Sequence, residues 1–134
     1  MNNFIFENSS KVYFGEGCVK EYLSSILSAY GDTVMLCYGG GSIKKSGIYD
    51  EVITVLKKEN KAVVEFSGIP SNPTYSKVLE GVKLAKESNA DLILAVGGGS
   101  VMDCCKAISL GAKYDADIWA DFWARLGVID FELL

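Results

Sequence analysis

The sequence predicts an α/β domain in which helices cover both faces of a parallel sheet. Three observations point to this class. Short apolar runs alternate with segments whose apolar residues recur at helical spacing. Glycine triplets directly follow two of the apolar runs, at 39–41 and 97–99. Strands that alternate with helices form βαβ units, and their right-handed crossovers bring the carboxyl ends of the strands to one edge of the sheet.

The N-terminal region predicts two short strands, at 4–6 and 12–14, joined by a turn at 8–10. An amphipathic helix is expected to start near Val19 and to end before Gly31, because its apolar residues recur every three or four positions.

The rest of the chain alternates regularly between the two kinds of element. Strands are expected at 34–38, 62–66 and 92–96, and helices over 48–59, around 78–85, and from the second triplet to about 112. A loop is expected at 67–73, since two prolines and a glycine disfavour regular structure there. Both triplets and this loop should lie at the carboxyl edge of the sheet, where ligands of open α/β sheets bind.

Composition indicates one folded domain. The chain has 134 residues, of which 49% are apolar, and a mean hydropathy of +0.21. It contains no apolar run of membrane-spanning length and its first residues do not resemble a signal peptide, so we expect a cytoplasmic protein with no membrane partner. A net charge of -4 without a long basic run argues against nucleic acid as a partner.

Cysteine and histidine usage limits the chemistry of this chain. Cys18, Cys37, Cys104 and Cys105 include no CxxC pair, so we expect reduced thiols in the core. The chain has no histidine, which removes the commonest general base and the commonest transition-metal ligand. No catalytic residue and no metal ligand is therefore predicted within it.

The glycine triplets are the strongest functional signal. A strand, a glycine turn and a helix N-terminus, as at Gly97, Gly98, Gly99 and Ser100, direct backbone N–H groups and a helix dipole at one point, which suits a phosphate. Neither triplet fits the spaced dinucleotide fingerprint or the P-loop, and a plain tight turn is an alternative. Because the pattern occurs twice, a groove for an extended nucleotide or another phosphorylated molecule is favoured.

The C-terminal region has an aromatic stripe at helical spacing. It consists of Ile118, Trp119, Phe122, Trp123 and Leu126. Such a stripe forms part of a core or a face for something outside this chain. A further apolar stretch stops at Leu134, so we expect residues 1–134 to be one domain that is cut at its C-terminal edge.

Several motifs make the chain resemble the N-terminal domain of the iron-containing (group III) alcohol dehydrogenases, closest to the NADPH-dependent branch of butanol dehydrogenases and aldehyde reductases. The motifs are FGEG at 14–17, YGGGSIKK at 38–45, NP at 72–73, GGGSVMDCCKA at 97–107 and DIW at 117–119. They follow the family order over nearly the whole chain. Glycerol dehydrogenase and dehydroquinate synthase relatives share the architecture but usually have lysine where Ser100 stands here.

The resemblance implies a Rossmann-like dinucleotide-binding domain. The C-terminal helical domain that holds a divalent metal in the family, iron or sometimes zinc, is absent from this chain. By the same resemblance, Gly97, Gly98, Gly99 and Ser100 hold the cofactor pyrophosphate, and Asp103, on the first turn of the next helix, faces the cofactor cleft. Asn72 corresponds to a contact near the adenosine end, although the proline that usually precedes it is Ser71 here.

The first triplet bears on cofactor choice. NAD-specific members of the family carry an aspartate at the position of Gly40, which repels a 2′-phosphate. With glycine there, Gly39, Gly40, Gly41 and Ser42 form a turn that can accept this phosphate. Two neighbouring lysines either add charge or form a solvated face, and these are Lys44 and Lys45. The resemblance therefore favours NADP(H) over NAD(H).

The expected function is the NADP(H)-binding portion of a metal-dependent alcohol dehydrogenase, which interconverts small primary alcohols and aldehydes by hydride transfer. We expect the chain alone to be inactive. The alternatives are a non-enzymatic nucleotide-binding module or fragment, and a relative of glycerol dehydrogenase or dehydroquinate synthase. A homodimer, formed partly through the N-terminal strands as in full-length relatives, is a further expectation.

Overall fold

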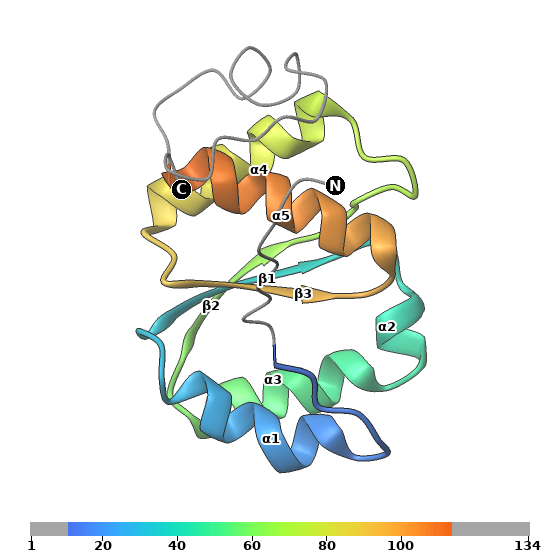
Figure 1. The fold of residues 1–134 in the computed structure, drawn as a ribbon, viewed down its shortest axis with the longest axis vertical. Coiled ribbons are helices and arrows are strands. Elements are labelled where there is room, and N and C mark those ends of the chain that lie inside the picture. Colours follow the sequence, from blue (N-terminus) through green and yellow to red (C-terminus); the bar gives the residue numbers. More distant parts are fainter. Residues whose placement is uncertain (1–10, 114–134) are drawn as a thin grey trace, which may run out of the picture.

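The computed structural model describes residues 11–113, which are drawn in colour in Figure 1. Its elements are α1 (Cys18–Leu27), β1 (Thr33–Tyr38), α2 (Ser42–Lys45), α3 (Ile48–Lys58), β2 (Ala62–Phe66), α4 (Tyr75–Ser88), β3 (Leu92–Val96) and α5 (Gly99–Lys113). The three strands form one parallel sheet in the order β2-β1-β3. The predicted α/β class and the alternation of its elements are confirmed.

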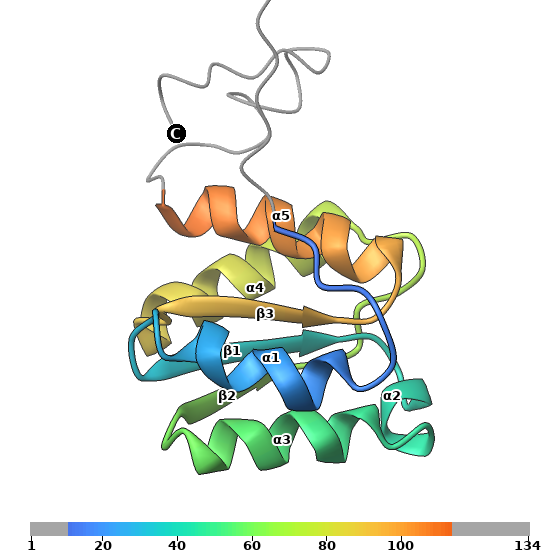
Figure 2. The same ribbon diagram turned by 60° about the horizontal axis from the view of Figure 1, so that its bottom comes forward.

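The central strand of this sheet is β1. Its Cα partners run from Thr33–Ala62 to Cys37–Phe66 on β2, and from Val34–Leu92 to Tyr38–Val96 on β3. Helices α1 and α3 cover one face of the sheet, whereas α4 and α5 cover the other (Figures 1 and 2). A strand that is buried on both faces needs apolar residues at every buried position, which explains the unbroken apolar run 34–38 of β1.

The two faces hold two separate hydrophobic clusters. Met35 and Cys37 of β1 pack with α4 and α5, whereas Val34, Leu36 and Tyr38 pack with α1 and α3. Successive side chains of a strand point to opposite faces, so one strand contributes to both clusters. These clusters fix the sheet on which the glycine turns are built.

Local signals fix where the helices begin and end. The Thr74 side chain accepts a hydrogen bond from the backbone N–H of Lys77 and caps α4, which ends at Asn89 in a left-handed conformation. In α3, acidic side chains occupy the first turn and Lys57 and Lys58 the last, where each sign of charge opposes the helix dipole.

Three N-terminal predictions need separate accounts. Residues 11–14 have no regular secondary structure, so the predicted strand at 12–14 is wrong. They pair with no described strand, and Val12 and Phe14 are 85% and 98% exposed. Helix α1 ends at Leu27 rather than just before Gly31, because the exposed Tyr30 is not part of its buried face. The predicted strand at 4–6 and the turn at 8–10 lie outside the described residues.

The cysteine prediction is confirmed where the structure describes it. All four cysteines are free thiols; Cys37, Cys104 and Cys105 are buried, and Cys18 is partly buried. Within residues 11–113, no helix is long and apolar enough to cross a membrane. The C-terminal aromatic stripe falls outside the described residues.

Candidate functional site

The two glycine triplets begin side by side at the carboxyl edge of the sheet. The last register pair between β1 and β3 is Tyr38–Val96, and Gly39 and Gly97 follow these residues directly. The chain passes from β1 to β2 on one side and then to β3 on the other, so the crevice between the ends of β1 and β3 is a topological switch point. Ligands of open α/β sheets bind at such a point.

In the second turn, the first glycine packs closely against α5, whereas the next two glycines border open space. Gly97 has a φ of 154°, and a Cβ there would lie 2.9 Å from a methyl group of Val101. A Cβ at Gly98 or Gly99 would meet nothing within 4 Å. The Gly98 carbonyl accepts from the Met102 N–H at 3.2 Å, which starts α5 and leaves the N–H groups of the first turn without partners inside the helix. This geometry suits a phosphate group.

The first turn is held by a different neighbour. None of its three glycines has a positive φ, but a Cβ at Gly39 would lie 3.0 Å from the carbonyl oxygen of Ile69. Gly40 and Gly41 are exposed, with open space where a Cβ would project, and Ser42 is exposed at the start of α2. The backbone of this turn is therefore also accessible to a ligand.

The loop at 67–73 joins the two turns. The N–H of Gly68 donates to the Gly39 carbonyl at 2.8 Å. At its other end, the Ser100 hydroxyl donates to the Ser71 carbonyl. Asn72 is exposed directly after this second attachment. The structure thus brings together the two triplets, Ser42, Asn72 and Ser100 at one edge, as the sequence predicted; that they bind a cofactor stays a prediction.

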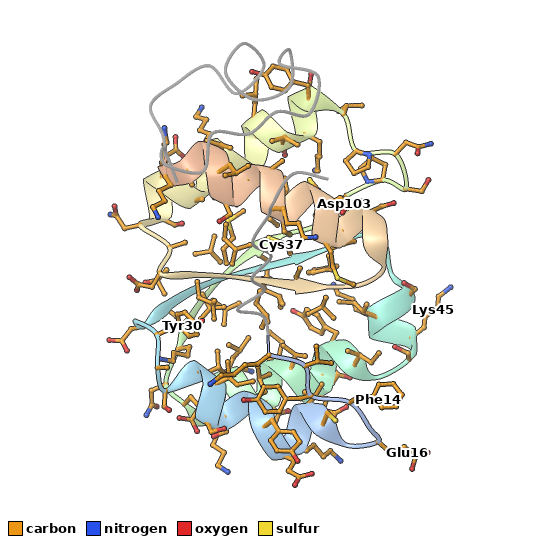
Figure 3. The ribbon with its side chains drawn as sticks, viewed as in Figure 1. Phe14, Glu16, Tyr30, Cys37, Lys45 and Asp103 are labelled. Carbon is orange, nitrogen blue, oxygen red and sulfur yellow. The ribbon has the colours of Figure 1, made fainter. Side chains whose placement is uncertain are left out.

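Asp103 lies further along α5 than expected. Helix α5 starts at Gly99, and its first turn contains no acidic residue, so the expectation of an aspartate on that turn is wrong. Asp103 is exposed on the outer surface of the helix (Figure 3). The reason is that Gly99 and Ser100 are already helical, which shifts Asp103 beyond the first turn.

A group of buried thiols lies beneath the second turn. Cys37 on β1 and Cys104 and Cys105 on α5 belong to one hydrophobic cluster. The hydrogen bond to Cys105 and burial both raise the pKa of Cys37, and burial raises the pKa of Cys104. Both thiols are therefore protonated at neutral pH and act as small core side chains.

The sequence analysis missed a cluster beside the first turn. Glu65 Oε1 accepts hydrogen bonds from the hydroxyls of Tyr38 at 2.9 Å and of Tyr49 at 2.7 Å. The bond to Glu65 raises the pKa of Tyr49 to about 12. The position of Glu65 near the carboxyl end of β2, beside the strand that leads into the triplet, is the signal that could have found this cluster.

Other features of the described chain do not extend the site. A groove of about 880 Å³ lies between the C-terminal halves of α4 and α5 and the start of β3, and none of its lining residues belongs to either triplet. Among residues 11–113, no three histidine, cysteine, aspartate or glutamate side chains are grouped so that they could hold a metal ion.

Comparison with known proteins places these features in a family. The family model of iron-containing alcohol dehydrogenase matches residues 9–130. The chain is 54% identical over 119 residues to probable NADH-dependent butanol dehydrogenase 1 of Bacillus subtilis. The aligned residues make up 89% of this chain and 30% of that protein. It is 40% identical over 118 residues to the NADPH-dependent aldehyde reductase YqhD of Escherichia coli, covering 88% of this chain and 30% of the relative.

Solved structures agree with the family model. The chain superposes on NADH-dependent butanol dehydrogenase A of Thermotoga maritima with a TM-score of 0.82 and 45% identity, over 91% of this chain and 31% of that one. The substrate- and cofactor-free form of YqhD gives a TM-score of 0.80 and 35% identity, over 96% and 33%. The chain thus spans about a third of the length of the proteins it matches. With its fold, its paired glycine turns and a family match over nearly its whole length, this chain belongs to the iron-containing alcohol dehydrogenase family.

Proposed function

We propose that this chain supplies the NADP(H)-binding part of a metal-dependent alcohol dehydrogenase that interconverts small primary alcohols and aldehydes. The observation that carries the proposal is the pair of accessible glycine turns at the switch point, tied together by the loop at 67–73. Relatives named butanol dehydrogenase and aldehyde reductase support the substrate class.

Each turn has its own part in the proposed site. The N–H groups at Gly97–Ser100 hold the pyrophosphate at the start of α5, where the helix dipole favours negative charge. The turn at 39–42 receives the adenosine end, with Asn72 beside it. Asp103, which is exposed one turn further along α5, is included as a proposed cofactor contact on the family resemblance alone. The bound nicotinamide supplies the hydride chemistry.

The preference for NADP(H) is part of the proposal. Gly40 places no carboxylate at the adenosine-side turn, so a 2′-phosphate meets no like charge there. Ser42 offers a hydroxyl donor, and Lys44 and Lys45 are the nearest basic side chains in sequence. The named relatives include both NADH- and NADPH-dependent enzymes, so this preference requires a direct measurement.

The chain alone is expected to bind cofactor without turnover. The described residues do not fit a metal ion, since they offer no grouped ligands, and the whole sequence has no histidine. We further propose a homodimer in which the exposed Val12 and Phe14 contribute to the interface. The free cysteines accord with a cytoplasmic location.

Titration of the purified chain with NADPH and with NADH tests the proposal, with intrinsic tryptophan fluorescence and thermal unfolding as readouts. We expect saturable binding of both, with NADPH the tighter ligand. The variant Gly98→Asp should abolish binding, because it directs a carboxylate into the space proposed for the pyrophosphate, whereas the control Gly98→Ala adds only a methyl group to open space.

Three results would contradict the proposal in different ways. If Gly98→Asp bound NADPH as the native chain does, the pyrophosphate would not lie at the second turn. Tighter binding of NADH would overturn the NADP(H) preference. Reduction of butanal by NADPH with the 134-residue chain alone would show that the chain is active without further residues.

A further inference from the structure

The segment that carries the first triplet is fastened at both ends to one carboxylate. Tyr38 directly precedes Gly39, and Tyr49 lies in the first turn of α3, after α2. Both hydroxyls donate to the same oxygen of Glu65, at 2.9 Å and 2.7 Å. The two rings also contact each other edge to face, with their centroids 5.7 Å apart. We call Tyr38, Tyr49 and Glu65 the tyrosine clasp.

Lys44, from the middle of the fastened segment, lies on this clasp. Its ammonium nitrogen is 4.8 Å from the ring centroid of Tyr49 and 5.6 Å from that of Tyr38. A cation over two ring faces is attracted by both, and phenols that donate to a carboxylate are more electron-rich, which strengthens the attraction. These contacts favour one position of the exposed Lys44 side chain, against the two rings, before any ligand arrives.

The ammonium of Lys44 nevertheless keeps its hydrogen-bonding capacity. In the part of the chain that the structure describes, it forms no ion pair and donates no hydrogen bond. Of the carboxylates around the clasp, Glu65 already accepts two phenol hydroxyls through its Oε1, and Asp50 helps to raise the pKa of Tyr49, but neither forms an ion pair with Lys44. An ordered cation with three unused N–H donors thus lies two residues beyond Ser42.

Lys45 differs from Lys44 in this respect. Both lysines are exposed, but no hydrogen bond, ion pair or ring contact within residues 11–113 involves the Lys45 side chain; Figure 3 shows it on the outer side of α2. A flexible lysine loses its rotamer freedom when it binds an anion, which a preordered lysine does not. The neighbouring lysines of the motif are therefore not equivalent.

We infer that Lys44, held by the tyrosine clasp, is the residue that discriminates the 2′-phosphate of an adenosine cofactor from the 2′-hydroxyl. Glu65 and Tyr49 are positioning residues that act through Lys44. This inference rests on the proposed binding of the adenosine end at the turn 39–42. It separates Lys44 from Lys45, between which the sequence could not decide.

The test compares two ligands that differ only at the 2′ position, adenosine 2′,5′-bisphosphate and adenosine 5′-monophosphate. The ratio of their dissociation constants, measured by calorimetry, isolates the contribution of the 2′-phosphate. Lys44→Met should reduce this ratio about tenfold, the size of a charge-assisted contact to phosphate. Lys44→Arg, which keeps a cation that stacks on aromatic rings, should retain most of the preference.

Matched variants separate charge from position. Lys45→Met removes an equal charge from the next residue and should change the ratio less than about twofold, as expected for a screened surface charge. Tyr49→Phe keeps the ring but removes its hydrogen bond to Glu65, and should lower the ratio by an intermediate factor while Lys44 is intact. Circular dichroism of each variant establishes that it is folded.

The outcomes distinguish this inference from the proposed function. If the native chain binds both ligands but Lys44→Met leaves the ratio unchanged, or Lys45→Met lowers it equally, the role of Lys44 is wrong and nucleotide binding stands. If the native chain binds both ligands equally, no residue of the turn discriminates the 2′-phosphate. If it binds neither, the adenosine site itself is wrong and the inference falls with it.

Discussion

The two glycine turns have the same four letters, GGGS, but the structure uses them differently. At the second turn, Gly97 adopts a φ of 154° and packs against Val101, so the turn is fixed by the helix that follows it. At the first turn, Gly39 has no positive φ and is held instead by the loop at 67–73, which approaches its backbone closely.

The helices that follow the turns extend this difference. Helix α5 runs from Gly99 to Lys113 and is buried along one side against the sheet, whereas α2 spans Ser42–Lys45. The first turn therefore relies on side chains outside its own helix, namely the tyrosine clasp. Identical motifs are thus held in place by different contacts. We therefore expect the stability of the chain to respond differently to substitutions in the two turns, and to depend on pH through the first turn.

The largest effect is expected at Gly97. The variant Gly97→Ala combines a backbone conformation that L-residues rarely adopt with a Cβ 2.9 Å from Val101, so unfolding free energy should fall by about 2 kcal/mol or more. Urea unfolding measures this loss. Gly98→Ala is the matched control and should change the unfolding free energy by less than about 0.5 kcal/mol. Equal effects at the two positions would show that Val101 does not restrict the turn.

A smaller effect is expected at Gly39. In Gly39→Ala the added Cβ lies 3.0 Å from the Ile69 carbonyl, so the loop must shift slightly, at a cost of about 1 kcal/mol. Gly40→Ala, whose Cβ projects into open space, serves as the control in the same unfolding experiment. A loss at Gly39 as large as that at Gly97 would mean that the two turns are equally constrained and would remove the distinction drawn above.

The smallest effect is a pH dependence confined to the first turn. The pKa of Tyr49 is raised from 10.0 to about 12, mainly by its hydrogen bond to Glu65. A pKa raised on folding contributes stability that is present below pH 10 and is lost as the pH rises toward 12. The native chain should therefore lose more stability than Tyr49→Phe between pH 9 and about 11.5 in urea unfolding.

The control for this pH dependence is Tyr30→Phe, which changes an exposed tyrosine outside the clasp. The unfolding free energy of this variant should change with pH as that of the native chain does over the same range. Parallel curves for native chain and Tyr49→Phe would show that the phenol–carboxylate bond adds nothing to stability.

Apolar periodicity was sufficient to predict most of the fold. The strands at 62–66 and 92–96 were predicted with the limits that the structure gives them, because both are short segments bounded by turn residues; 92–96 is continuously apolar, and 62–66 is interrupted only by Glu65. The strand at 12–14 was wrong because alternation in a few residues cannot show whether a neighbouring strand is present. The end of α1 was misplaced because Tyr30 continues the periodic pattern without being buried.

The site was predictable where it depends on the backbone and less so where it depends on side chains. Parallel topology places Gly39 and Gly97 at one edge regardless of detail. The convergence of Tyr38, Tyr49 and Glu65 instead depends on strand register and on the path of the chain through α2, which the sequence pattern does not contain. The same holds for the attachment of Ser100 to the loop.

The double attachment of the loop at 67–73 has a consequence for how the two turns respond to each other. Because this loop is bonded to Gly39 at one end and to Ser100 at the other, displacement of either turn strains a bond to the other. If the pyrophosphate of the proposed dinucleotide fixes the position of the loop at the second turn, the adenosine half no longer has to do so at the first turn. By thermodynamic reciprocity this effect is mutual, so under the proposed dinucleotide binding the loop would couple the pyrophosphate turn and the adenosine turn favourably.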